Sequence, residues 1–317
     1  MSHLWETDNL KKIFPVSTSW GQKQQAVNAL QGISLYQDEG ETLGIVGESG
    51  CGKSTFGLTL IGLYEPTSGT IKINGNIITQ KTDDALFWNT MQMVFQNPFA
   101  SLNPRMMVRT MLEEPLLVHT NYTKQDRRDR INEVLNQVGL TPMQGERYAH
   151  EFSGGQRQRI GIARALIMNP KCIICDEPIS ALDVSIQVQI MTLLERLQAQ
   201  QGVSYVFISH DLNMVRYISH RIAVMYLGAV VEEGFAVDVY NRPQHPYTKA
   251  LLSVNGAVSP KAPIQIALDG ELPNPMNPPV GCLFSSRCKE VEPRCLVERP
   301  PLISCNASKV ACWHCVP

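Results

Sequence analysis

The stretch that most constrains this chain is Gly-Glu-Ser-Gly-Cys-Gly-Lys-Ser-Thr at residues 47–55. The residues before it, 41–46, predict a short buried strand, and residues 55–61 predict a helix. Glycines allow a tight turn whose N–H groups point inward and form a nest for an anion, and the helix presents the positive end of its dipole to the same anion. A chance glycine-rich turn would lack these flanking elements, whereas a strand, such a loop and a helix in this order are typical of a phosphate-binding loop. We therefore expect a nucleotide to bind here.

The side chains of this loop have separate expected roles. Lys53 can reach the β- and γ-phosphates, and the hydroxyl of Ser54 can bind Mg²⁺. The remaining loop residues are expected to enclose the phosphates: Gly47, Ser49, Gly50, Cys51, Gly52 and Thr55.

Charge and hydropathy exclude several other classes of function. With 28 basic and 29 acidic residues the net charge is −1, so no general field attracts nucleic acid or anionic lipid. The N-terminus does not have the pattern of a signal peptide, and we expect no membrane span because no apolar run reaches about 18 residues. A role at a membrane would therefore require docking on another protein.

The rest of the chain alternates between expected strands and helices. The spacing predicts strands within 9–46, at 69–73 before an Asn-Gly turn, at 91–95 and at 203–209. Helices are expected at 108–117, 124–138 and 184–200, and strands at 221–227 and 229–233 are expected to complete the sheet. Phe14, in the first strand region, could stack on a base, although a lone Phe is more often part of a core.

Residues 152–159 predict a helix start with unusual glycines. Ser153 is a natural N-cap for the helix that follows. Gly154 and Gly155 each cost about 1 kcal/mol of helix stability relative to Ala. Two explanations stay open: the glycines expose N–H groups to an anion, or this is an ordinary glycine-containing helix entry.

Two carboxylates follow the apolar run at 172–175. A buried strand there would deliver Asp176 and Glu177 to its C-terminal edge, where ligands bind in open α/β sheets. Asp176 suits Mg²⁺ and Glu177 suits proton abstraction from a water, while an acidic turn is the alternative. His210 at the end of a later strand could hydrogen-bond a γ-phosphate, but a lone His is more often structural.

Taken in order, these segments resemble the ATP-binding subunits of ABC transporters over residues 8–255. The matching motifs are the phosphate loop, a Q-loop glutamine (Gln96), a signature at 152–156, Asp176-Glu177, a D-loop at 180–183 and a switch histidine (His210). Phe152 departs from the signature's usual leucine. The resemblance implies an α/β P-loop NTPase, an ABC ATPase with a RecA-like core, an antiparallel β subdomain and a helical subdomain at about 97–170, plus a small Cys-rich C-terminal extension.

The resemblance also implies where the site residues act. ATP is held between two subunits arranged head to tail, with Phe14, the phosphate loop, Gln96, Asp176 and the catalytic pair Glu177 and His210 on one subunit. The signature residues come from the other: Ser153, Gly154, Gly155 and Gln156. Mg²⁺ is held by Ser54, Gln96 and Asp176, and Asp183 is counted among the nucleotide-binding residues.

Three further stretches are similar to the oligopeptide/dipeptide importer branch of that family. They are residues 96–105, residues 243–252, and residues 270–275 followed by 281–288. This similarity implies a nucleotide-binding domain at 1–255 and an extension at 256–317. It also implies a second homologous ATPase subunit, two transmembrane permease subunits and an extracytoplasmic peptide-binding protein as partners, without nucleic acid. The location implied is peripheral, on the cytoplasmic face of the inner membrane, and peptides, nickel or another small solute stay open as cargo.

Six of the nine cysteines lie between positions 282 and 315. Their spacing is not that of a zinc ribbon, because only Cys312 and Cys315 form a short C-x₂-C pair. The family resemblance implies a [4Fe–4S] cluster on Cys282, Cys288, Cys295 and Cys312, with zinc or free thiols as alternatives. Cys305 and Cys315 leave the fourth ligand open.

Two other functions are weighed against the importer. A soluble ABC ATPase acting on ribosomes or DNA would usually carry two nucleotide domains or a coiled-coil insertion, together with a basic surface. An iron–sulfur redox protein regulated by ATP would not need the full hydrolytic set of residues that this sequence contains.

Overall fold

The protein is described by a computed structural model at residues 3–16, 25–78, 89–97, 101–254 and 272–315. The chain forms two compact units. The first contains Met1–Asp38, Thr42–Thr79 and Phe207–Pro317, and the second contains Glu39–Glu41 and Gln80–Val206. Residues 98–100 and 270–271, which belong to the importer-like stretches, lie outside the described residues.

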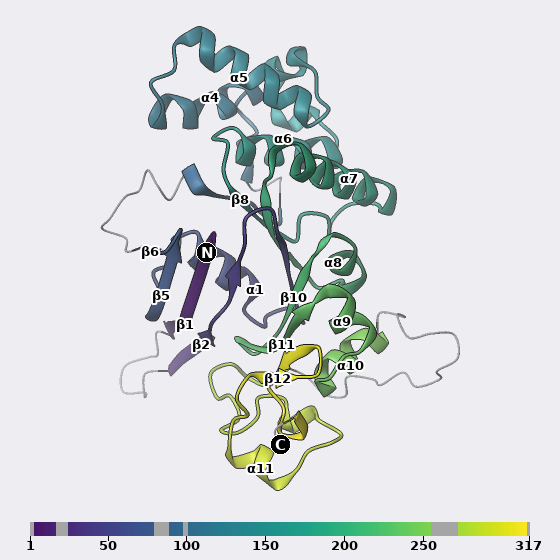
Figure 1. Cartoon of the computed structure of the whole chain (residues 1–317). Helices are drawn as coiled ribbons and strands as arrows, with labels where there is room; N and C mark the ends of the chain where they lie inside the picture. Colours follow the sequence, from purple (N-terminus) through teal and green to yellow (C-terminus); the bar gives the residue numbers. More distant parts are fainter. Residues whose placement is uncertain (1–2, 17–24, 79–88, 98–100, 255–271, 316–317) are drawn as a thin grey trace. The chain divides into compact units, whose positions relative to one another are not determined.

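The first unit contains a five-stranded antiparallel sheet with the order β2-β1-β5-β6, to which β3 adds beside β1 (Figure 1). Asn74 and Gly75 both have positive φ angles in the turn between β5 and β6, as their sequence predicts. The strands are β1 (Trp5–Val16), β2 (Gln25–Ile33), β3 (Tyr36–Gln37), β5 (Ser68–Ile73) and β6 (Asn76–Ile77).

A second sheet of this unit carries the phosphate loop. Its strands are β4 (Thr42–Val46), β9 (Ser204–Ser209), β10 (Arg221–Tyr226), β11 (Ala229–Phe235), β12 (Ile303–Cys305) and β13 (Ser308–Val310), in the order β12-β13-β11-β10-β4-β9. The division between the units falls within β9. β4 and β10 are parallel, and every residue of β4 is buried, as expected for a strand covered on both faces.

The expectation that residues 229–233 complete the sheet is wrong. β11 continues to Phe235 and pairs with β13, which in turn pairs with β12, so the C-terminal segment extends the sheet (Figure 1). These added strands protect an edge that would otherwise expose unpaired backbone groups. Strands of three residues are too short to show a hydrophobic period, and the sequence therefore did not indicate them.

Two helices of the first unit, α8 and α9, contact this sheet. At Gly44 of β4 a side chain would meet Val215 of α8, because a Cβ there would lie 2.1 Å from Cγ1 of Val215. Strand and helix therefore approach closely at a position that only glycine can occupy. The helices are α1 (Lys53–Leu60), α8 (Leu212–Ile218), α9 (Ala236–Asn241), α10 (Pro246–Val254) and α11 (Pro293–Val297), with 3₁₀ turns at Ser285–Arg287 and Trp313–Cys315.

The second unit is mainly helical. Its parallel strands β7 (Met91–Val94) and β8 (Cys172–Asp176) align Val94 with Cys175. The helices are α4 (Val108–His119), α5 (Lys124–Gln137), α6 (Gly154–Leu166) and α7 (Val184–Gln201), with 3₁₀ turns at Pro142–Glu146 and Ala149–Glu151. Within the described residues, none of the helices has the length and the apolar character needed to cross a lipid bilayer.

Candidate functional site

The phosphate loop lies between β4 and α1 and depends on glycine for its shape. Gly52, the N-cap residue of α1, has a φ of 102°, and a Cβ there would lie 2.5 Å from the carbonyl oxygen of Ala29. At Gly47 a Cβ would lie 2.2 Å from the carbonyl oxygen of Met225. Both positions exclude a side chain because neighbouring backbone occupies the space. The loop is thus closed around its backbone amides at the start of a helix, the arrangement that binds anions.

Lys53 supplies the positive charge of the loop. Its side chain is buried, and the ammonium donates hydrogen bonds to the carbonyl oxygens of Gly47 at 2.7 Å and Glu48 at 2.9 Å. A buried ammonium requires such partners. Burial raises the pKa of the neighbouring Cys51 thiol, against the opposing effect of Lys53, so the thiol stays protonated at neutral pH.

Phe14 and His210, expected at the base and the γ-phosphate, also belong to the first unit. Phe14 is half-buried on β1 and meets Tyr64 edge-on at 5.2 Å between ring centroids, with Nζ of Lys12 4.9 Å from the Phe14 centroid. His210 is exposed directly after β9, and the next residue, Asp211, accepts a hydrogen bond from the N–H of Asn213 as the N-cap of α8. An aromatic ring that is partly exposed can still stack on a base.

Asp176, Glu177 and Gln96 belong to the second unit. Asp176 ends β8 and is 6% exposed. Glu177 has a φ of 44°, a left-handed conformation that non-glycine residues rarely adopt and that is often found at functional sites. Nε2 of Gln96 donates to Oε2 of Glu177 at 2.8 Å. The structure therefore brings the expected general base and the Q-loop glutamine into contact.

The signature residues form the start of α6. Ser153 is the N-cap, as expected, and it forms a capping box with Gln156: the Ser153 N–H donates to Oε1 of Gln156 at 3.1 Å, and the Gln156 N–H donates to the Ser153 hydroxyl at 3.4 Å. At Gly155 a Cβ would lie 2.6 Å from Cγ2 of Ile186, whereas at Gly154 it would be in ordinary contact with Leu182. The helix start is therefore closely packed at Gly155. Asp183 is exposed and caps α7 through its carbonyl oxygen, which accepts from two backbone N–H groups.

The four cysteines expected to hold a cluster interact with one another. Burial raises the pKa of Cys288 to about 11, and the neighbouring Cys282 and Cys312 raise it further. Burial also raises the pKa of Cys312, and the neighbouring Cys282 and Cys295 raise it further. A backbone hydrogen bond of 2.8 Å joins the N–H of Cys282 to the carbonyl oxygen of Cys295.

The two additional cysteines pair separately. Cys315 hydrogen-bonds to Cys305, and burial together with this contact raises the pKa of Cys315 to about 12. No three His, Cys, Asp or Glu side chains in the described part of the chain are placed to hold a metal ion together. The thiols of Cys282, Cys288, Cys295 and Cys312 thus have the chemistry of soft-metal ligands, but in the described residues they are not arranged as a ligand set.

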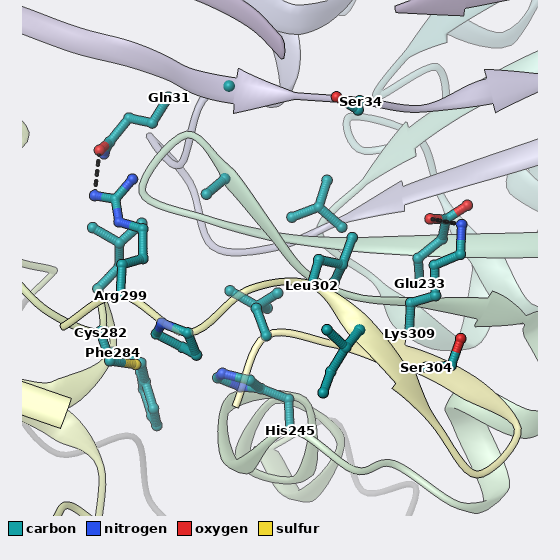
Figure 2. A pocket seen from close by; sticks show the side chains of 18 residues that line it. Gln31, Ser34, Glu233, His245, Cys282, Phe284, Arg299, Leu302, Ser304 and Lys309 are labelled. Carbon is teal, nitrogen blue, oxygen red and sulfur yellow. Dashed lines mark hydrogen bonds and ion pairs between the residues drawn. The ribbon is translucent and has the colours of Figure 1, made fainter. Parts of the chain in front are cut away.

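A cavity of about 660 Å³ lies between β2, β11 and the C-terminal segment (Figure 2). Cys282, Phe284 and His245 contribute to its lining, and Arg299 donates to Oε1 of Gln31 across it at 2.8 Å. Among the described residues, those that line it include none of the phosphate loop.

Sequence reasoning missed two residues from the C-terminal half of the chain that contact Glu48, the second residue of the phosphate loop. The backbone N–H of Glu48 donates to the hydroxyl of Tyr247, and its carboxylate accepts two hydrogen bonds from Arg287. A carboxylate in a loop that binds anions was the available signal, but nothing in the sequence indicated which cation, if any, would neutralise it.

Comparison with known proteins gives matches over nearly the whole chain. Residues 30–180 match the family described as "ABC transporter", and residues 231–295 match "Oligopeptide/dipeptide transporter, C-terminal region". The chain is 49% identical to the oligopeptide transport ATP-binding protein AppF of Bacillus subtilis, over 98% of this chain and 96% of that protein. It is 48% identical to the oligopeptide transport ATP-binding protein OppF of Salmonella typhimurium, over 99% and 97% of the two chains.

Solved structures agree with this assignment. The dimeric post-hydrolysis structure of the ATP-binding cassette MJ0796, bound to ADP and Pi, matches with a TM-score of 0.65 and 31% identity, over 73% of this chain and 98% of that one. CbiO1 from Clostridium perfringens, part of the ABC transporter complex cbiONQ, matches with a TM-score of 0.65 and 26% identity, over 76% and 92%. The fold is that of an ABC ATPase, and the chain belongs to the ATP-binding proteins of the oligopeptide/dipeptide ABC transporter family.

Proposed function

We propose that this protein is the ATP-hydrolysing subunit of an ABC importer for oligopeptides or dipeptides. The observation that carries the proposal is the 49% identity to AppF over 98% of the chain. The match of residues 231–295 to the C-terminal region of oligopeptide/dipeptide transporters supports the same cargo. We retain the domain limits 1–255 for the nucleotide-binding part and 256–317 for the extension.

In this proposal the phosphate loop binds the polyphosphate and Phe14 stacks on the base. Lys53 turns from the loop carbonyls to the β- and γ-phosphates and offsets their charge. Ser54, Gln96 and Asp176 would hold Mg²⁺, which would supply positive charge beside the phosphates. Glu177 accepts a proton from the attacking water, Gln96 orients the Glu177 carboxylate, and His210 donates to the γ-phosphate oxygen.

The residues that complete the nucleotide site are proposed to come from a second, homologous ATPase subunit. That subunit contributes Ser153, Gly154, Gly155 and Gln156 across the interface, while Asp183 lies in the same contact region. Exposed Val184 and Val188, four residues apart on α7, provide an apolar face next to Asp183. The dimeric state of the MJ0796 cassette with ADP and Pi supports this arrangement.

The membrane partners are proposed to be two transmembrane permease subunits, which receive peptide from an extracytoplasmic binding protein. The ATPase would then be peripheral, on the cytoplasmic face of the membrane. Leu117 and Val118 at the end of α4, and Tyr122 just after it, are exposed and offer an apolar contact for such a partner.

The test of this function is Glu177→Gln. The amide keeps the size of the side chain but cannot accept the proton, so we expect ATP binding to persist and turnover to fall by roughly 10²–10⁴-fold, the usual contribution of a general base. Blocked hydrolysis should also stabilise the ATP-bound pair, which gel filtration with the natural ATPase counterpart would detect. Glu39→Gln, in an exposed turn of the same unit, is the control and should hydrolyse ATP at the wild-type rate. Unchanged hydrolysis in Glu177→Gln would refute its role as the base.

We further propose a [4Fe–4S] cluster that cross-links and stabilises the C-terminal segment. Its ligands would be Cys282, Cys288, Cys295 and Cys312. The backbone hydrogen bond between Cys282 and Cys295 and the preference of iron–sulfur clusters for thiolates support this. When bound, the cluster supplies a covalent cross-link among the four chain positions, and binding releases the thiol protons.

The test is Cys288→Ser in protein purified without oxygen. We expect the brown colour, the iron and the acid-labile sulfide to be lost, while MgATP binding remains. Cys305→Ser, which alters only the separate pair, should keep all three. A colourless wild-type protein, or equal bleaching by Cys305→Ser, would contradict this ligand set.

A further inference from the structure

Glu48, the second residue of the phosphate loop, has each of its polar groups held by a partner. Its backbone N–H donates to the hydroxyl of Tyr247 at 2.9 Å, and its carbonyl oxygen accepts from Nζ of Lys53 at 2.9 Å. Its carboxylate accepts from both terminal nitrogens of Arg287, at 2.6 and 3.1 Å. The conformation of the loop at this residue is therefore determined from outside the loop as well as within it.

The arginine is buried and firmly placed. The side chain of Arg287 is 5% exposed and that of Glu48 is 26% exposed. A third hydrogen bond, of 3.4 Å, joins Arg287 to the hydroxyl of Tyr226. Two parallel hydrogen bonds from a planar guanidinium fix direction as well as charge, which a lysine could not do. Since 239 residues separate the partners, the contact makes the phosphate loop depend on the C-terminal segment.

An aromatic cluster supports both contacts. Tyr247 is fully buried, with its ring centroid 4.7 Å from that of Tyr226 and 5.5 Å from that of Phe284. Phe284 also packs perpendicular to Tyr226 at 5.3 Å. Phe284 precedes Arg287 by three residues, so one short C-terminal stretch places the arginine and supports the tyrosine.

The charge of Glu48 matters for a loop that binds phosphates. An unneutralised carboxylate beside a polyphosphate repels it, and partial burial strengthens that repulsion. Arg287 removes most of this charge through the bidentate pair. Tyr247 meanwhile accepts from the N–H of Glu48, so phosphate binding does not draw on this amide.

We propose that Arg287 and Tyr247 are positioning residues for nucleotide binding, through which the C-terminal segment sets the shape and charge of the phosphate loop. The inference rests on the proposed function, because it requires that this loop binds ATP. It adds to that function a dependence of nucleotide affinity on a segment far from the phosphate loop in sequence.

The first test compares Arg287→Gln with the double variant Glu48→Gln/Arg287→Gln. In the full-length protein, titration calorimetry with MgADP, and with MgATP at low temperature, should show about tenfold weaker binding for Arg287→Gln, within the usual range of coupling between contacting residues. The double variant should regain most of this loss because the unneutralised carboxylate is gone. If Arg287 only helped the C-terminal segment to fold, removing a carboxylate from the phosphate loop would not restore binding.

The matched control is Arg294→Gln, in the same C-terminal segment. Arg294 is half-exposed and pairs with Glu298 at 2.9 Å, away from the loop, so nucleotide affinity should not change. Wild-type affinity in Arg287→Gln, equal losses in Arg287→Gln and Arg294→Gln, or a double variant as weak as Arg287→Gln would each overturn the proposal.

Two conservative variants cover the case in which Arg287→Gln fails to fold. Arg287→Lys keeps the charge but loses the bidentate geometry, and Tyr247→Phe loses only the hydroxyl that accepts from Glu48. Each should weaken MgADP binding about threefold, and wild-type affinity in both would overturn the proposal. Failure of the wild-type protein to bind MgADP or MgATP would instead refute the proposed function.

Discussion

At the scale of single residues, Gly155 shows how packing can require glycine at a position that is also proposed to bind nucleotide. The sequence left open whether the glycines of α6 expose an anion site or belong to an ordinary helix entry. A Cβ at Gly155 would lie 2.6 Å from Cγ2 of Ile186, whereas one at Gly154 would lie 3.5 Å from Cδ2 of Leu182. Packing therefore requires glycine at position 155 but permits alanine at position 154. Steric constraint thus does not explain why residue 154 is a glycine.

This difference predicts opposite effects on stability. Gly155→Ala should lower the free energy of unfolding by about 1–3 kcal/mol, the cost of overpacking a stiff β-branched neighbour. Gly154→Ala should leave it unchanged or raise it by up to about 1 kcal/mol, because Ala favours helix. Urea unfolding monitored by circular dichroism measures both.

A rescue variant distinguishes the clash from other causes. Adding Ile186→Ala to Gly155→Ala makes room for the new methyl group and should return part of the lost stability, beyond the sum of the two single effects. Equal destabilisation by Gly154→Ala and Gly155→Ala would show that the contact with Ile186 is not what requires glycine.

At the scale of elements, a buried carboxylate joins β11 to two segments that follow it. Glu232 on β11 accepts hydrogen bonds from the backbone N–H groups of Gln244 and His245 and from the hydroxyl of Ser308 on β13. His245 itself is buried, and its Nδ1 accepts from the N–H of Tyr247, 3.0 Å away, at the start of α10. A protonated imidazole could not accept that hydrogen bond, so the helix start requires neutral His245.

This arrangement predicts loss of stability in mild acid. Burial lowers the pKa of His245 from 6.5 to about 3, with a smaller lowering by Lys249 and an opposing hydrogen bond to the backbone of Ala311. Between these two values the unfolded chain binds the proton and the folded chain does not, so stability rises with pH through this window and is lost as pH falls. From pH 7.5 to pH 5 the linkage amounts to about 2 kcal/mol.

Thermal unfolding at these two pH values measures the effect. His245→Asn, whose side-chain oxygen can accept from Tyr247 without titrating, should be less stable than the wild type but should lose less stability on acidification. An equally steep pH dependence in the variant would assign the effect to other groups.

At the scale of the whole molecule, the proposed site residues are divided between the two compact units. The phosphate loop, Phe14 and His210 belong to the first, whereas Gln96, the signature, Asp176 and Glu177 belong to the second. The C-terminal segment returns to the first unit, where it adds strands to the sheet and contacts Glu48 through Arg287. The ATP-dependent pairing expected for Glu177→Gln is the readout at this scale, because the proposed pairing depends on signature residues of a second subunit.

Much of this organisation was predictable from local pattern. The expected strand, loop and helix at the phosphate loop are present, as are α4 and α5. In α5 the buried Ile131, Val134 and Leu135 follow the helical period. The Ser153 cap was predictable because capping depends on residues within one turn. The short helices α8 and α9 and the strands β12 and β13 were not, because elements of so few residues carry too little periodicity to be recognised.

What the sequence alone determined is the set of motifs whose physics acts over a few residues: the glycines of the phosphate loop, the strand that ends in Asp176 and the cap of α6. Only the tertiary structure decided which distant groups meet, such as Arg287 with Glu48, Glu177 with Gln96 and β13 with β11. The physical reason is that local pattern specifies backbone conformation through steric and hydrogen-bonding preferences of neighbours. Contacts between residues far apart depend on how complete elements pack, and no short window of sequence records that.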